Sequence, residues 1–311
     1  MLLAGLSLAG GSAQAADRED FGFLSEHLLE SGVDSRYAGL PWTAGRIERG
    51  RWQYSLQAGY SDTGNALMDL RGPMLAAGLA FDVRDSWAIE GMAFVDSLDV
   101  GGEGGREDLH PLIADVDVPL DLPNEAVFSE PRGRLAHRGV GLSFVHQFRS
   151  SDPRRFWSLH GGVMWERYEA RDVATRYLLA AGADAGVAGV IDYSSTYDFG
   201  TPYLMAEVNR PLGSRFDFSP RALLVVPLPR QSFDVALSAP GFEIRGTSPT
   251  RPIGDTYVGL GLEIRDRRSG LAADLGTSLT FPFVEELQHP GIDRALTFQL
   301  VWHSRRHPSH G

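Results

Sequence analysis

Cysteine is absent from the 311-residue sequence, which excludes disulfides, thiolate metal sites and cysteine nucleophiles. Basic residues are also scarce, since 29 of them face 40 acidic residues, whereas a nucleic-acid-binding protein needs a basic surface. No run of about 18 apolar residues follows the N-terminus, so no transmembrane helix is expected. The sequence also lacks a glycine-rich phosphate loop. We therefore predict no cofactor and no nucleic-acid partner.

The N-terminus carries the pattern of a secretory signal. Leu2–Gly11 is an apolar segment, and Ala13-Gln14-Ala15 follows with the small-x-small spacing of a cleavage site. We predict a signal peptide over residues 1–15, so that the mature chain begins at about Ala16 and is exported.

A short amphipathic helix is predicted over residues 17–32. Phe21, Leu24 and Leu28 fall on one helical face, and acidic residues crowd the first turn, where the helix dipole favours them. An extended stretch follows, so that residues 16–50 form a helix and linker before the main domain. The apolar face of the helix needs a cover, either the mouth of that domain or a lipid leaflet.

The stretch 51–61 sets the pattern for the rest of the chain. Its even positions are apolar, and its odd positions are polar or glycine. This is the period-2 alternation of a β-strand with one apolar and one polar face. Trp52 and Tyr60 lie at the two ends of the apolar face, which is where a membrane-spanning strand places its aromatic residues.

The same alternation recurs along the chain and predicts ten strands. They span 51–61, 73–83, 87–98, 136–149, 156–170, 201–209, 215–227, 257–265, 270–283 and 293–303. Tight turns near residues 84, 152, 212 and 267 alternate with longer connections, three of them much longer. Short turns on one side and long loops on the other indicate a transmembrane barrel whose short side faces the periplasm.

With this pattern, residues 51–303 resemble bacterial outer-membrane β-barrel proteins, which commonly end on an aromatic residue, here Trp302. The resemblance implies an all-β fold, a ten-stranded antiparallel transmembrane β-barrel in contact with outer-membrane lipid. The even number of strands puts both termini in the periplasm, with residues 16–50 on that side and residues 304–311 as a polar tail. The alternative architecture is a soluble β-sandwich or a large lipocalin-like barrel, which would bury the apolar face.

Aromatic residues at the predicted strand ends are assigned to the two membrane–water interfaces. They are Trp52, Tyr60, Trp87, Trp157, Trp165 and Trp302.

The opposite, inward faces of the strands are rich in charge. Eight strands enclose only side chains and sixteen leave a channel, so ten should leave little open lumen. We predict a lumen network of Arg51, Glu90, His160, Glu207, Asp217, Arg221, Glu263 and Asp274. Carboxylates at one height in a low-dielectric interior need counter-charges, so the network should centre on Arg221 and block free passage. A path for ions or small solutes is the alternative.

Two groups of residues are candidates for a catalytic or a metal site. Ser158 and His160 are neighbours on one strand face, but Glu166 lies too far along the strand to orient the histidine. The aspartates Asp115, Asp117 and Asp121 form a cluster of hard oxygen ligands without EF-hand spacing, and we predict no metal site.

The long connections hold two further features. His110 and His289 each follow acidic pairs, and acid–His pairs at a barrel rim could activate water, as in the omptin class of ten-stranded outer-membrane proteases. No omptin motif is present, so this is an analogy of fold alone. Thr175–Ile191 is apolar and rich in alanine and glycine, which favours a packed lid or a loop helix.

The preferred function is therefore an outer-membrane β-barrel with a largely plugged lumen. Its role would be restricted passage of small solutes, or a structural and surface-interaction function. The sequence does not identify a periplasmic partner. The alternative is an outer-surface hydrolase acting on peptide or lipid, which would need a tight acid–His or Ser–His contact at the extracellular rim.

Overall fold

The computed structural model describes residues 47–64, 69–102, 106–108, 125–152, 154–179, 188–226, 228–229, 233–239, 242–248, 256–281 and 294–304. The strands in these ranges are β1 (Trp52–Gly64), β2 (Asp69–Arg84), β3 (Trp87–Gly101), β4 (Arg106–Asp108), β5 (Glu125–Arg149), β6 (Phe156–Leu179), β7 (Ala188–Leu212), β8 (Phe216–Val225), β9 (Leu228–Pro229), β10 (Phe233–Ala239), β11 (Phe242–Ser248), β12 (Thr256–Asp266), β13 (Leu271–Phe281) and β14 (Arg294–His303). Within these ranges, no helix is long and apolar enough to cross a membrane.

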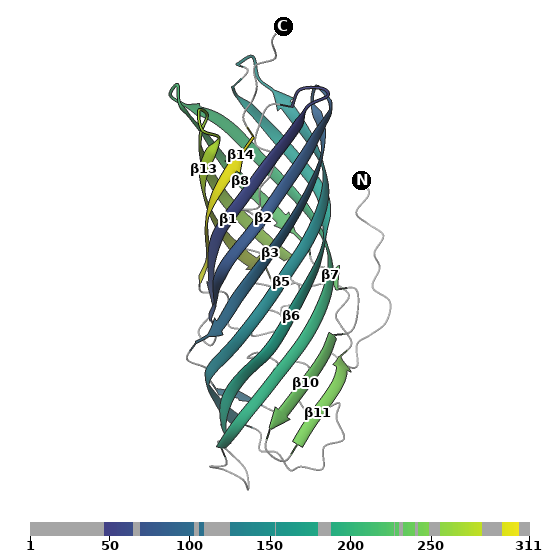
Figure 1. Ribbon diagram of the computed structural model, residues 1–311, viewed down its shortest axis with the longest axis vertical. Helices are drawn as coiled ribbons and strands as arrows, with labels where there is room; N and C mark the ends of the chain where they lie inside the picture. The colour runs from purple at the N-terminus through teal and green to yellow at the C-terminus, as the bar shows by residue number, and fades with distance from the viewer. Residues whose placement is uncertain are drawn as a thin grey trace.

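Ten of the strands close into one antiparallel barrel (Figure 1). The order round the wall is β1, β2, β3, β5, β6, β7, β8, β12, β13 and β14, and β14 pairs with β1 again. These are the ten strands predicted from the alternation, in chain order, so the predicted barrel is confirmed and the β-sandwich alternative is wrong. The predicted signal peptide, the helix over 17–32 and the tail from residue 305 lie outside the described residues.

The strands are staggered as they go round the barrel. Starting at Trp52 on β1, paired residues can be followed from each strand to the next round the barrel. At the step from β13 to β14, the register is continued by two residues. The path returns to β1 at Gly64, twelve residues further along. Such a stagger goes with strands tilted by about 35–45°. Residues at one height therefore differ by about one position from each strand to the next.

The two ends of the barrel differ. At one end, the turn end, β2–β3, β5–β6, β7–β8 and β12–β13 are joined by short turns. At the other, the loop end, β5, β6 and β7 run on beyond the remaining strands, and the β10–β11 hairpin pairs with β7 there (Figure 1).

The extended strands correct one prediction. Residues 171–179 and 188–200, expected in a loop, are strand, and residues 175–179 and 188–191 of the apolar segment belong to β6 and β7 rather than to a loop helix. The predicted aspartate cluster at 115–121 and the two His-Pro pairs lie outside the described residues.

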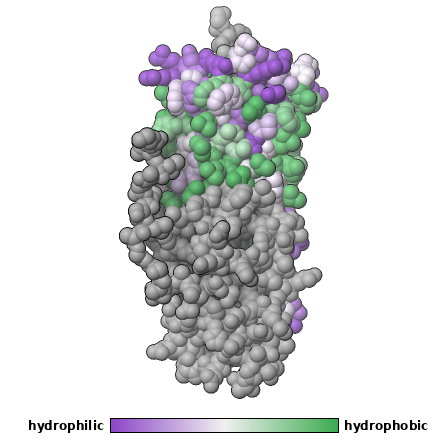
Figure 2. Space-filling view, turned by 180° about the vertical axis from the view of Figure 1, so that it is seen from behind, coloured by the Kyte–Doolittle hydropathy of each residue, from purple (hydrophilic) through white to green (hydrophobic). Residues whose placement is uncertain are grey.

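The outer face of the wall is apolar. Alternate residues such as Phe144, Leu300 and Leu75 keep more than half of their surface exposed, at 59%, 58% and 58%. Figure 2 shows the hydrophilic turn end above a band dominated by apolar residues. A soluble protein would bury such a continuous belt, whereas a transmembrane barrel shows it to lipid.

The six predicted interface aromatics all point outward, with exposures from 39% for Trp165 and Trp302 to 51% for Trp52 and Tyr60. Trp52, Trp87, Trp157 and Trp302 lie near the turn end, and Tyr60 and Trp165 lie eight residues further along β1 and β6. Eight residues span about 26 Å along a strand, or about 20 Å in height at the usual tilt. This agrees with an apolar band about 25 Å tall.

A charge placed in the middle of the belt should be costly. Leu300→Arg is expected to destabilise the barrel by about 2–4 kcal/mol, because Leu300 lies near mid-belt, whereas Leu212→Arg at the turn end should cost about 0–1 kcal/mol. Both leucines are more than half exposed, at 58% and 55%. Urea unfolding in lipid vesicles measures both. Equal, small effects would mean that the outer face does not meet lipid.

Candidate functional site in the barrel lumen

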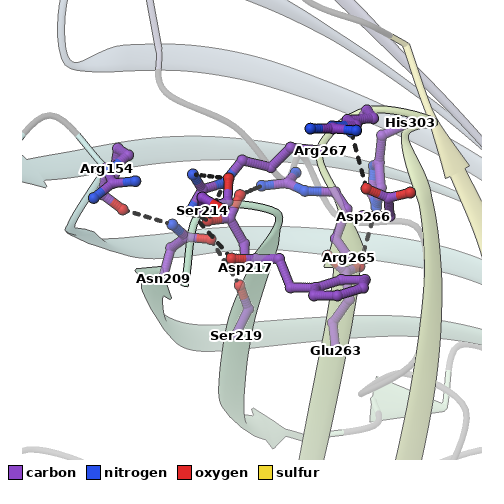
Figure 3. A network of polar contacts seen from close by, with 12 residues as sticks. Arg154, Asn209, Ser214, Asp217, Ser219, Glu263, Arg265, Asp266, Arg267 and His303 are labelled. Atoms are coloured by element: carbon purple, nitrogen blue, oxygen red, sulfur yellow. Dashed lines mark hydrogen bonds and ion pairs between the residues drawn. The ribbon is translucent and has the colours of Figure 1, made fainter. Parts of the chain in front are cut away.

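The inward side chains form five polar or apolar groups between the turn end and the loop end. Nearest the turn end is the rim network, centred on Asp217. The carboxylate of Asp217 accepts hydrogen bonds from Arg265, at 3.2 Å, and from Nη2 of Arg267, at 2.6 Å (Figure 3). Beside it, Ser219 donates to Asn209 at 3.0 Å, and Asn209 donates to the carbonyl of Arg154 at 2.8 Å. These contacts tie β7, β8 and β12 together where the strands end.

Ile47, which comes shortly before β1 in the chain, also lies inside the mouth at the turn end. Ile47 is 1% exposed and packs against Ala88 and Val145, two inward residues of β3 and β5. Its amide donates to the side-chain oxygen of Gln147 at 3.0 Å, and its carbonyl accepts from Arg149 at 3.1 Å. Ile47 therefore fills part of the turn-end mouth.

Arg51, predicted to belong to the lumen network, lies at this mouth. Its guanidinium pairs with Glu48 at 3.2 Å, and its side chain is 21% exposed. The structure does not bring Arg51 into contact with the charges deeper in the lumen.

The next group is the arginine network of Arg221, Glu207, Glu263 and Asp274, with each residue on a different strand. Arg221 is 2.7 Å from Glu263 and 2.9 Å from Asp274, and its Nε is 3.9 Å from Glu207. All four side chains are at most 1% exposed. His303 on β14 joins the network through a 3.0 Å contact with Glu263. One guanidinium thus serves three buried carboxylates.

Glu90 and His160, two further predicted residues, meet on the opposite side of the lumen. Nδ1 of His160 lies 3.2 Å from Glu90, and Nε2 lies 3.2 Å from the hydroxyl of Ser158. Ser143 also donates to Glu90, at 3.1 Å. Glu90, from β3, is the acid behind the histidine that the sequence pattern alone did not supply.

The Ser158–His160–Glu90 order matches that of a nucleophilic triad. The contact lies inside the lumen and not at an outer rim, and Ser158 and His160 are 2% and 0% exposed. A substrate carbonyl cannot reach the serine in this state. The contacts instead satisfy polar groups that would be costly to bury alone.

On the loop-end side of these charges lies the methionine layer, formed by Met92, Phe94 and Met164. Their exposures are 5%, 6% and 0%. The layer fits because glycines face it from β5. A Cβ at Gly139 would come within 2.5 Å of the Phe94 ring, and one at Gly141 within 2.9 Å of Met164. The large side chains at this height thus occupy space that the two glycines leave free.

The histidine bridge, towards the loop end, consists of Asp96, His137 and Glu166. Nδ1 of His137 is 2.7 Å from Asp96 and Nε2 is 2.9 Å from Glu166, and all three side chains are at most 1% exposed. The ring stacks on Tyr168 at 4.1 Å and lies 4.7 Å from Phe94. The bridge joins β3, β5 and β6. Of its members only Glu166 was singled out from the sequence.

Nowhere in the described part of the chain do three or more His, Asp or Glu side chains converge to hold a metal ion. The histidine bridge shows why, since its carboxylates lie on opposite sides of the imidazole ring and do not face a common point.

No protein-family model and no curated protein matches the sequence significantly. Solved structures that resemble the chain include the outer membrane protease OmpT from Escherichia coli, at 10% identity and a TM-score of 0.46, over 84% of this chain and 96% of that one. The translocator domain of the autotransporter NalP from Neisseria meningitidis is 10% identical with a TM-score of 0.36, over 94% and 100% of the two chains. The outer membrane protein OprG from Pseudomonas aeruginosa is 6% identical with a TM-score of 0.33, over 84% and 99%. The likeness is one of architecture, and the chain resembles bacterial outer-membrane β-barrels in general.

Proposed function

We propose that the chain is an outer-membrane barrel whose lumen is closed to free diffusion, so that it serves a structural or surface-interaction role and passes small solutes only in a restricted way. The methionine layer carries this proposal. Met92, Phe94 and Met164 lie between the arginine network and the histidine bridge with almost no exposed surface. A water-filled channel beside them would leave these side chains accessible.

The strands that project at the loop end support the surface-interaction role. β5, β6 and β7 have 25, 24 and 25 residues, against 10 or 11 for β8, β12, β13 and β14. Their extra length lies beyond the apolar belt, where it does not help to span the membrane. A closed barrel that carries such a wall is suited to present it outside the cell.

The proposed orientation has the turn end, with both termini and residues 16–50, in the periplasm. Short turns occupy that side in outer-membrane barrels. Epitope tags inserted at Gly102, at the loop end, should be labelled by antibody on intact cells, whereas tags at Ser151, in the β5–β6 turn, should be labelled only after lysis. The opposite result would reverse the barrel in the membrane.

Closure of the lumen predicts low conductance. In planar bilayers the wild-type barrel should show no steady ion current, because the methionine layer leaves no hydrated path. Phe94→Ala combined with Met164→Ala removes two of the three large side chains and should produce measurable openings. Leu300→Ala with Leu275→Ala on the outer face serves as the control and should stay silent. A steady wild-type current would contradict the closed lumen and favour an open path.

A further inference from the structure

The outer face of the wall changes abruptly from apolar to charged on six neighbouring strands. The change follows directly after Tyr60 on β1 and Trp165 on β6, the interface aromatics nearest the loop end. The outward charged residues just beyond it are Asp62, Arg71, Asp99, Arg138, Arg167 and Asp198. At this height a membrane protein meets lipid headgroups.

Two arginines of this boundary stand side by side. Arg138 on β5 and Arg167 on β6 are direct cross-strand partners, and the pair next to them toward the belt is Val140 and Trp165. Like charges in this position repel each other and destabilise a sheet. A site that keeps them together calls for a compensating group of opposite charge.

Each of the two arginines pairs with an acidic residue on a neighbouring strand. Arg167 makes two 2.7 Å hydrogen bonds to Asp198 on β7, and Arg138 donates to Glu169 at 3.1 Å. The two guanidinium side chains are 45% and 63% exposed, and exposed pairs of this kind are weak. A guanidinium has five N–H donors, so each arginine keeps donors for a second acceptor.

We propose that Arg138 and Arg167 clamp a phosphate group on the headgroup of a membrane lipid in the leaflet at the loop end. Guanidinium groups recognise phosphate through paired hydrogen bonds. The acyl chains of such a lipid would run down the belt beside Val140 and Trp165, which are 54% and 39% exposed. This part of the wall therefore presents phosphate-binding groups toward the loop end and an apolar surface on the side of the belt.

The charges at the site favour a lipid over free phosphate. Arg138 and Arg167 together balance Glu169 and Asp198, so the site has no net charge to attract a dissolved anion. A lipid already anchored in the leaflet brings its phosphate at a high effective concentration, as tethered groups do. The proposal is independent of lumen closure, since it concerns only the outer face.

The test uses the full-length barrel in an uncharged detergent. Bis-phosphorylated lipid A, the same lipid after dephosphorylation and inorganic phosphate are added separately, and bound lipid is measured by native mass spectrometry. Wild type should retain the phosphorylated lipid at least tenfold better than the dephosphorylated one. Arg138→Ala with Arg167→Ala should abolish this preference, and the double Lys variant should keep part of it. Heat-dependent gel mobility shows that each variant is folded.

The matched control is Arg215→Ala at the turn end, where an exposed arginine pairs with Asp266 at 3.1 Å. It should retain the phosphorylated lipid like wild type. Glu169→Gln with Asp198→Asn should strengthen retention, because it removes the competing acids. Equal retention by the double Ala variant, or no preference for the phosphorylated lipid in wild type, overturns the proposal. Displacement of the lipid by millimolar inorganic phosphate would also overturn it and indicate a free-anion site. None of these outcomes alters the conductance, so this proposal and the closed lumen fail separately.

Discussion

Arg221→Ala is expected to destabilise the barrel by about 3–5 kcal/mol, the cost of removing one partner from a buried ion pair. The guanidinium lies within 4 Å of carboxylates on three strands, and its removal leaves Glu207, Glu263 and Asp274 together at no more than 1% exposure. His303 contacts only Glu263 and cannot replace it. Urea unfolding in detergent, followed by tryptophan fluorescence, measures the loss.

In a barrel already opened by Phe94→Ala with Met164→Ala, the same substitution should also change the conductance. Three carboxylates without their guanidinium form a negative layer that favours cations, so small cations are expected to enter from the turn end. Arg215→Ala is the control, because its exposed pair with Asp266 lies at the rim and should leave both stability and conductance nearly unchanged. If Arg221→Ala changes neither the stability of the barrel nor the cation conductance of the opened barrel, the lumen is a wide hydrated space in which each charge is solvated separately.

The sequence predicted the strands well because one face meets lipid and the other meets polar lumen groups, so alternation is enforced residue by residue. It failed where that contrast ends. β6 and β7 continue past Trp165 and Gly200 into a wall that lies beyond the belt, and the outward residues there are charged, such as Arg167 and Asp198. With polar residues on the outer face too, the period-2 signal fades and the extensions resembled loops.

The sequence predicted which residues face the lumen. It did not predict how far along the barrel axis each of them lies. Asp217 was expected beside Arg221, yet it pairs with Arg265 and Arg267 at the rim. Counting residues from strand ends neglects the stagger of about one residue per strand, which displaces β8 from the strands counted first. The centre of the predicted network depended less on height, because Arg221 is long and Glu207 is its direct cross-strand partner.

The histidine bridge was missed for a related reason. Asp96 and His137 occupy inward positions that the alternation already marks, but their contact depends on the β3–β5 register across a long connection. A single sequence indicates which face of its strand each residue occupies. It does not show how two distant strands are aligned with each other. Three residues on three strands therefore gave no recognisable motif, although the alternation placed each of them on an inward face.

His137→Ala is expected to be as damaging as Arg221→Ala, at about 3–5 kcal/mol. The ring lies between Asp96 and Glu166 and stacks on Tyr168, so its loss leaves a cavity and two buried carboxylates without the group that separates them. The bridge also joins β3, β5 and β6 where the last two leave the belt. Limited proteolysis should therefore cut the projecting parts of β5 and β6 faster in the variant.

Charge and cavity contributions can be separated with further substitutions. His137→Ala combined with Asp96→Asn and Glu166→Gln removes both carboxylate charges, and most of the lost stability should return, because neutral amides cost far less to bury than unpaired carboxylates. His146→Ala is the control for loss of an imidazole, since His146 is only half-buried and contacts Trp87 and Phe148 near the turn end. If the triple variant stays as unstable as His137→Ala alone, the bridge acts through packing against Tyr168 and Phe94, and its charges contribute little.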